Sequence, residues 1–144
     1  MIMELKKIYS EHFPLKGFTA TTIFPFVFVR IDRVWNFTAK AERHETTHAL
    51  QQIELAIVGL ILATISLIFG YGWWSLLFLP LFFWLYALEF LVKLPFCKFD
   101  TIRAYMSIST EQEAYEHQDE FGYNNVRKHF AFSKFLFTIK PVEK

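Results

Sequence analysis

Charge is missing from a long part of this chain. Residues 55–88, 34 in succession, contain no Asp, Glu, Lys or Arg, although 20% of the 144 residues are charged. An apolar stretch of roughly 20 residues is enough to cross a bilayer, so this run argues against a soluble globule. It also argues against a disordered tail, because disordered segments are poor in apolar residues.

Cysteine and net charge are scarce as well. The single cysteine, Cys97, excludes an internal disulfide, so nothing in the composition implies an oxidising compartment. The formal net charge is only +1, which argues against nucleic acid as a partner because nucleic-acid-binding domains usually carry a basic face. The length suits a single domain covering residues 1–144.

The uncharged run predicts two membrane helices. Gly70 and Gly72 flank a tyrosine, a typical turn signal that divides the run into spans of about 53–70 and 73–92. Trp73 and Trp74 follow at once, as in the aromatic belt of a membrane interface. Pro80 falls inside the second span, where a kink is tolerated. We therefore expect a two-helix transmembrane hairpin in contact with the lipid bilayer.

The flanking charges orient this hairpin. Lys40 and Arg43 precede it, whereas Lys93, Lys98 and Arg103 follow it, and its tip carries no charge. Because positively charged loops stay on the cytoplasmic side, both termini are expected in the cytoplasm. We expect an integral membrane protein, of the kind found in a bacterial inner membrane.

A pattern typical of zinc-binding sites lies just before the first span. His44, Glu45 and His48 form the pattern His-Glu-x-x-His, on a helix expected to begin at Asn36 or Thr38. Two histidines four positions apart share one helix face and can bind one Zn²⁺. The metal lowers the pKa of a coordinated water, and Glu45 can act as the general base that takes its proton.

The motif helix is expected to continue into the membrane. No Gly or Pro interrupts residues 39–58, so one helix should carry both the motif and the first span. His48 precedes Leu55 by seven residues, a rise of roughly 10 Å. The metal should therefore lie in the cytoplasmic headgroup zone.

A catalytic zinc needs a third protein ligand, and residues 109–117 supply two carboxylates for it. If Thr110 is the helix N-cap, Glu113 completes a capping box and Glu111 stays free to bind metal. If Ser109 is the N-cap instead, this distinction weakens. The preferred ligand is Glu111, with Glu113 as the alternative.

The two motifs together resemble the gluzincin metallopeptidases. In membrane-bound members, such as CAAX-prenyl endopeptidases and HtpX-like proteases, the third ligand opens a Glu-x-x-Ala-Asp stretch, which places Glu111 and Ala114 here. In those families the Asp supports a zinc-binding histidine. Here Tyr115 stands at the Asp position, so no residue is assigned to that supporting role. The thermolysin-like pattern Glu-Ala-x-x-Asp places Glu113 as ligand and His117 in the Asp position instead. Small bacterial membrane proteins of unknown function carry a similar motif pair. The resemblance implies Zn²⁺ as cofactor and a peptide bond as substrate.

Four further side chains are candidates for supporting the metal or contacting substrate: Gln51, Arg103, Tyr115 and His117. Tyr105 could polarise a substrate carbonyl together with Arg103. Glu54 and Glu89 lie at the cytoplasmic ends of their helices and could approach one another or pair with Lys93. Glu89 is also a weak candidate for a zinc ligand.

Two flanking segments complete the prediction. Residues 18–34 are rich in β-branched and aromatic residues and predict a strand, which Pro25 confines to a sheet edge or splits in two. Such an edge could add a substrate peptide as a further strand, or the segment could simply dip its Phe side chains into lipid. Residues 126–140 mix Lys and Arg with Phe, which is typical of an amphipathic surface helix or of a protein-binding tail.

The sequence thus predicts a mainly α membrane fold, with a minimal zincin-like core and a short N-terminal β segment. The leading function is a zinc metallopeptidase that cleaves a membrane-associated peptide or protein at the cytoplasmic interface. The same chemistry would serve an ester or a lipid amide. One alternative is a catalytically inactive zincin-like membrane protein that binds or senses a partner. A membrane di-iron oxygenase is weaker, because the chain has only five histidines and no second histidine box.

Overall fold

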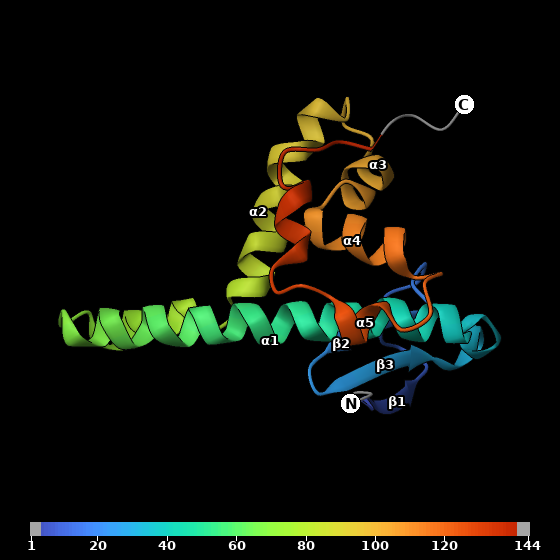
Figure 1. Ribbon diagram of the computed structural model, residues 1–144, viewed down its shortest axis with the longest axis horizontal. Helices are drawn as coiled ribbons and strands as arrows, with labels where there is room; N and C mark the ends of the chain where they lie inside the picture. Colours follow the sequence, from blue (N-terminus) through green and yellow to red (C-terminus); the bar gives the residue numbers. More distant parts are fainter. Residues whose placement is uncertain (1–3, 141–144) are drawn as a thin grey trace.

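The computed structural model describes residues 4–140, which form a mainly helical protein with one small sheet (Figure 1). A long helix, α1 (Ala39–Ile68), forms its axis. The sheet lies along one side of the N-terminal half of α1, and the later helices lie along the other (Figure 1). The mainly α fold with a short N-terminal β segment agrees with the prediction.

The sheet has the strand order β1-β3-β2. Strands β2 (Ala20–Ile23) and β3 (Phe26–Arg30) pair antiparallel on either side of Pro25, so the expected split into two short strands is confirmed. Strand β1 (Lys6–Ser10), which the sequence pattern did not predict, pairs parallel to β3. A 3₁₀ helix, η1 (Ile31–Asn36), then leads to α1.

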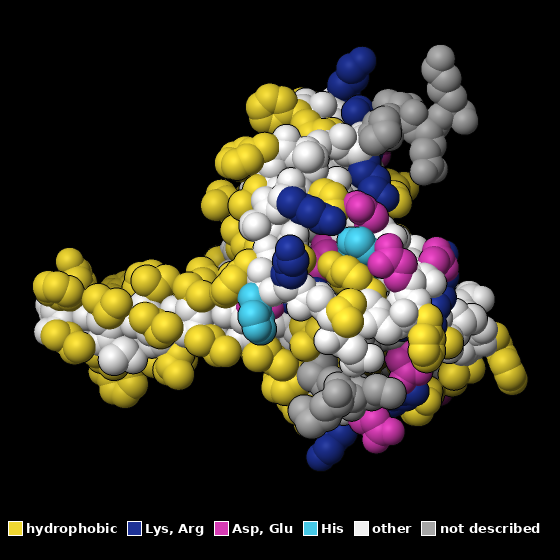
Figure 2. All heavy atoms as spheres, in the orientation of Figure 1, with side chains coloured by type: hydrophobic (Ala, Val, Ile, Leu, Met, Phe, Trp, Pro, Cys, Tyr) yellow, Lys and Arg dark blue, Asp and Glu magenta, His cyan; other side chains and the backbone are white. Residues whose placement is uncertain are grey.

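Helix α1 begins after Thr38, one of the two predicted N-caps. Its 30 residues correspond to about 45 Å, and it runs without interruption from the motif into the apolar run, as expected. Its first half is buried in the body of the protein. Its second half carries exposed Ile and Leu side chains and projects from the body as a rod (Figures 1 and 2).

The return from this rod differs from the predicted second span. Instead of one helix over residues 73–92, the chain forms a 3₁₀ helix, η2 (Gly72–Phe78), and then α2 (Leu81–Phe96), bent by 65° from it. The break falls at Pro80, which lacks the N–H that a continuous helix would use. Among residues 4–140, only α1 is long and apolar enough to cross a membrane by itself; η2 and α2 would add a second span only as one bent unit.

We call residues 57–78, comprising the second half of α1 and η2, the apolar finger. Gly59 allows the close contact inside it, because a Cβ at this position would overlap the carbonyl of Phe78 at the end of η2. Tyr71, Trp73 and Trp74 are exposed at its tip. After the bend, α2 leaves the direction of α1 and returns to the body (Figure 1).

Helix α2 positions the helix that carries the predicted third ligand. After α3 (Thr101–Met106), α4 (Ser109–His117) begins at a backbone N–H that donates to Glu89 Oε2 on α2, at 2.8 Å. Glu89 also pairs with Lys93 at 2.9 Å, which confirms one of the predicted pairings. The N-cap of α4 is Ile108, so the proposed caps Thr110 and Ser109 are both wrong. Glu89 substitutes for a local cap because it accepts the free N–H group at this helix end.

The C-terminal segment is not the amphipathic helix proposed from its sequence. It contains only a single turn, α5 (Tyr123–Val126), and a short 3₁₀ helix, η3 (Ala131–Phe135). Phe132 is buried against Leu55 of α1 and Phe82 of α2, so the segment is part of the core. One of its basic residues, Arg127, is buried in ion pairs with Glu54 and Glu113.

Candidate metal centre

Two helices bring three metal-binding side chains together. His44 and His48 lie one turn apart on α1, and Glu111 comes from the first turn of α4. The two Nε2 atoms are 3.1 Å apart, and the Glu111 oxygens lie 3.4 Å from His44 Nε2 and 3.3 Å from His48 Nε2. Ligand atoms about 2.0 Å from a tetrahedral ion would be about 3.3 Å apart. This buried group could therefore hold a metal ion.

The surroundings of the three side chains fit a cation. Glu111 Oε2 is buried without a hydrogen-bond donor among the described residues, whereas its Oε1 accepts a hydrogen bond from Tyr86 at 3.0 Å. Leaving a buried carboxylate oxygen without a partner costs free energy. A divalent cation would satisfy that oxygen, and three protein ligands is the number typical of catalytic zinc sites.

Electrostatics couple His48 to Glu111. Burial by itself lowers the pKa of His48, but the charge and hydrogen bond of Glu111, with smaller contributions from Glu45 and Gln51, together raise this pKa from 6.5 to about 9. Burial likewise favours the neutral form of Glu111, yet the nearby histidines hold the pKa of its carboxyl well below the ordinary value. In the metal-free chain a proton on His48 therefore takes the place of a cation.

The three side chains open into a cavity of about 270 Å³ that Glu45 also lines. The polar residues that line it include Thr22, Gln52, Tyr86 and Tyr105. Most of its wall is apolar and comes from the N-terminal segment and α2: Phe13, Pro14, Leu15, Phe18, Phe82 and Phe83. The cavity therefore offers a mostly apolar space beside Glu45.

Strand β2 is held against the motif helix at Glu45. The Thr22 hydroxyl donates to Glu45 Oε2 at 2.7 Å, which fixes this carboxylate toward the cavity. Gln52, one turn beyond His48, donates to the Thr22 carbonyl and accepts from the Phe24 N–H, both at 2.8 Å. One backbone group of β2, the Thr22 carbonyl, and one just beyond it, the Phe24 N–H, are thus already bonded to α1, which limits where a peptide could add to this strand.

Gln51 contacts the proposed ligand His48 and does not line the cavity. Its Oε1 lies 2.9 Å from His48 Nδ1, and the side chain is completely buried. Its Nε2 donates to the Thr110 carbonyl at 3.1 Å and to Glu113 Oε2 at 3.0 Å. Of the two roles proposed for this residue, the geometry is that of support for the metal ligand.

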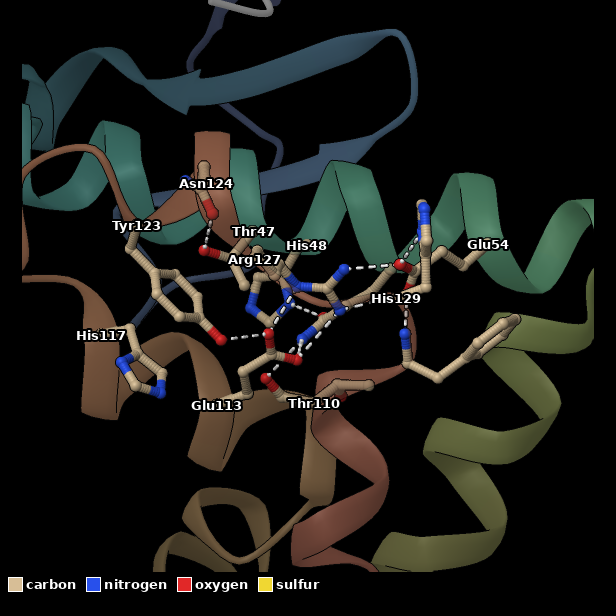
Figure 3. A network of polar contacts seen from close by, with 12 residues as sticks. Thr47, His48, Glu54, Thr110, Glu113, His117, Tyr123, Asn124, Arg127 and His129 are labelled. Atoms are coloured by element: carbon tan, nitrogen blue, oxygen red, sulfur yellow. Dashed lines mark hydrogen bonds and ion pairs between the residues drawn. The ribbon is translucent and has the colours of Figure 1, made fainter.

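The structure separates the remaining candidates. Glu113 faces Tyr123 and Arg127 (Figure 3) and accepts a hydrogen bond from Gln51. It lies outside the possible metal-binding group, to which Glu111 belongs. Arg103 donates to the carbonyl of Lys140, and His117 stacks on Tyr123 with 3.8 Å between ring centres; neither lines the cavity. Of this group only Tyr115 touches a proposed ligand, through an edge contact with the His44 ring at 4.6 Å.

Tyr115 contacts the His44 ring but does not accept a hydrogen bond from its Nδ1. His44 Nδ1 is buried and has no hydrogen-bond partner among residues 4–140. An aspartate would accept a hydrogen bond from this atom, but the tyrosine contacts only the ring. The two proposed ligand histidines thus differ, because in the described part of the chain only His48 has its Nδ1 hydrogen-bonded.

Sequence reasoning missed Thr22, Tyr86 and Arg127. Tyr86 carries a hydroxyl inside the uncharged run, a signal that could have marked it as facing a polar site. Thr22 lies in a strand of alternating pattern that contains other threonines, and nothing local distinguishes it. Arg127 lies among basic and aromatic residues that predicted only a surface helix.

No protein-family model matches the chain, and neither the curated proteins nor the solved structures contain a significant match.

Proposed function

We propose that the chain is a zinc-dependent integral membrane metallopeptidase that cleaves peptide bonds at the cytoplasmic membrane interface. The observation that carries this proposal is the convergence of His44, His48 and Glu111, with ligand atoms 3.1–3.4 Å apart, beside Glu45 in one cavity. Two histidines and one glutamate are a donor set typical of catalytic zinc. Zinc would supply Lewis-acid polarisation of the substrate carbonyl and activation of water.

The residues around the cavity would perform the proton chemistry. Glu45 takes the proton of the attacking water and passes it to the leaving amine, while the Thr22 hydroxyl holds its Oε2 in place. Tyr105 can donate a hydrogen bond to the substrate carbonyl oxygen. Burial, and then the charge of Glu111, raise the pKa of Tyr105, so its hydroxyl keeps its proton at neutral pH.

The exposed apolar surface supports a location in the membrane. The apolar finger is covered by hydrophobic side chains on the face shown in Figure 2. The exposed face of α2 continues this surface with Trp84, Leu88, Leu91, Val92 and Phe96. Because α2 is bent by 65° from η2, we propose that the finger enters the bilayer while α2 lies near its surface.

This arrangement would place the metal centre at the interface. His48 precedes the start of the finger at Ile57 by nine residues, about 13 Å along α1. A second apolar cavity, of about 370 Å³, lies at the base of the finger and shares Gln52, Phe82 and Phe83 with the metal cavity. A substrate anchored in the membrane could therefore reach the metal centre along an apolar surface. The flanking Lys and Arg residues favour the cytoplasmic side.

The test compares Glu45→Gln with Glu42→Gln, a matched change at a half-exposed position on the same helix that pairs with Lys7. Both proteins should bind one zinc ion, since neither glutamate is a proposed ligand. Cleavage of a membrane-associated peptide library should fall at least about 100-fold in Glu45→Gln alone, because general-base catalysis contributes about that much. Folded wild-type protein without bound zinc, or a Glu45→Gln variant as active as the control, would refute the proposal.

One observation favours a second candidate, a metal-binding membrane protein without catalysis. His44 Nδ1 lacks a hydrogen-bond partner within residues 4–140, and Tyr115 occupies the position where the resembled peptidases have an aspartate. A ligand without such support binds metal less firmly and is oriented less well. Stoichiometric zinc together with no cleavage of peptide libraries or lipid extracts would favour this second candidate.

A further inference from the structure

A buried polar network lies directly behind His48, on the side away from the proposed metal (Figure 3). Gln51 connects His48 Nδ1 to Glu113, and Glu113 in turn pairs with Arg127. The side chains of Glu113 and Arg127 are 0% and 3% exposed. None of the chemistry described above uses this arginine.

Arg127 joins two carboxylates that come from different helices. Its guanidinium bonds both oxygens of Glu113 on α4, at 2.5 and 3.1 Å, and both oxygens of Glu54 on α1, at 2.6 and 3.1 Å. Tyr123 donates to Glu113, and His129 also contacts Glu54. Only a planar guanidinium can contact four oxygens in this way, because a lysine ammonium is a single point of charge.

The network determines which nitrogen of His48 is free. The Nε2 of Gln51 donates to the Thr110 carbonyl and the Glu113 carboxylate, both of which can only accept hydrogen bonds. The amide oxygen of Gln51 must therefore face His48, which makes Nδ1 the donor. Neutral His48 then presents the lone pair of Nε2 to the position between the proposed ligands.

Arg127 keeps this arrangement from reversing. If Glu113 lost the guanidinium that bonds both of its oxygens, its buried carboxylate would turn away from Gln51, and the Gln51 amide could flip. The flipped amide would donate to His48 Nδ1 and favour the tautomer with a proton on Nε2, which cannot bind a metal through that atom.

We propose that Arg127 is a positioning residue of the metal centre, acting through Glu113 and Gln51 to hold His48 in its metal-binding tautomer and orientation. This inference rests on the proposed metal site. It adds a residue 79 positions beyond His48 in the chain, from a segment without a metal-binding motif.

The experiment titrates the metal-free full chain, in detergent micelles, with Co²⁺, whose visible absorption bands report coordination geometry. The variants are Arg127→Lys, which keeps the charge but loses the double fork, and Gln51→Met, which removes the bond to His48 without unpairing a buried charge. The control is Arg30→Lys. Arg30 is a buried arginine bonded to Asp32 and to the Pro14 carbonyl, none of which belongs to the metal group.

We expect Arg127→Lys and Gln51→Met to bind Co²⁺ about 10- to 100-fold more weakly than Arg30→Lys and to show altered bands, as for other residues that support metal ligands. Thermal unfolding identifies any variant that does not fold, and Gln51→Met carries the test if Arg127→Lys is unfolded. If the absorption bands and Co²⁺ affinity of folded Arg127→Lys equal those of Arg30→Lys, the positioning role of Arg127 is overturned but the metal site is not. No Co²⁺ binding by folded wild-type protein would overturn the metal site as well.

Discussion

The pH dependence of metal binding follows directly from the pairing of His48 with Glu111. Because the pKa of His48 is raised from 6.5 to about 9, a metal ion must displace a proton from this side chain at neutral pH. Only about one molecule in 100 has neutral His48 at pH 7, so the apparent affinity should be roughly 100-fold below its plateau above pH 9. It should rise about tenfold per pH unit between pH 7 and pH 9.

The assay is competition for Zn²⁺ between the protein and a chelator, with the chelator's own protonation taken into account. Glu111→Gln is the informative control, since it removes the largest attraction that raises the pKa of His48. This variant should bind zinc more weakly, because a ligand is lost, but its affinity should change little above pH 7. Wild-type affinity that is independent of pH between 7 and 8.5 would refute the coupling.

The same pair affects the stability of the metal-free protein in the opposite direction. For His48, the folded pKa is higher than the unfolded one, so its contribution is complete below pH 6.5 and is lost as pH rises through about 9. For Glu111, the folded pKa is lower, so its contribution is complete above pH 4.5 and is lost as pH falls through the folded value. Thermal scans with a chelator should therefore show the largest contribution of this pair between about pH 4.5 and 6.5.

Two further substitutions test the fold around the site. Gly59→Ala should lower the free energy of unfolding by about 1–3 kcal/mol, because the new Cβ would overlap the last carbonyl of η2. The control is Thr64→Ala, at an exposed position on the same helix. Equal denaturation midpoints for the two variants would contradict this packing. Lys93→Met should cost about 3–5 kcal/mol, because it leaves Glu89 buried without its cation. Lys40→Met, in an exposed ion pair, should cost under about 1 kcal/mol, and a Lys93 variant equally mild would show that Glu89 does not depend on this pair.

The two histidines and the glutamate of the motif could be placed from the sequence because helical spacing is local. Once residues 39–58 were expected to form one helix, His44 and His48 had to share a face. The continuous helix from the motif into the uncharged run followed from the same argument. Both features depend on residues a few positions apart, which is why α1 agrees with the prediction.

The preference for Glu111 over Glu113 assumed that Glu113 takes part in a capping box, which the structure does not contain at the start of α4. Thr110 is not the N-cap of α4, and Glu113 has no capping role. Instead Glu89 of α2 holds the first turn of α4, while Arg127 engages Glu113 and leaves Glu111 beside the histidines. Which carboxylate faces the cavity was decided by contacts between segments far apart in the chain.

The bend after the finger shows a second limit of sequence reasoning. Pro80 indicated a kink, but not that α2 would turn by 65° and bring Glu89 to the first residue of α4 and Lys93 to the Ser107 carbonyl just before it. Hydropathy gives the length of an apolar run and carries no information on its direction after a break. The size of the turn depends on what α2 meets, which is set by packing.

The sequence alone determined the uncharged run, the motif and the helix that contains both, because these features depend on residues within a few helical turns of each other. Tertiary structure decided the choice of Glu111, the support of Glu45 by Thr22, and the link from Arg127 to His48. The physical reason is that a buried carboxylate must find a partner, and that partner can lie anywhere in the chain. For Glu54 it is an arginine 73 residues away, which only the folded chain brings within 2.6 Å.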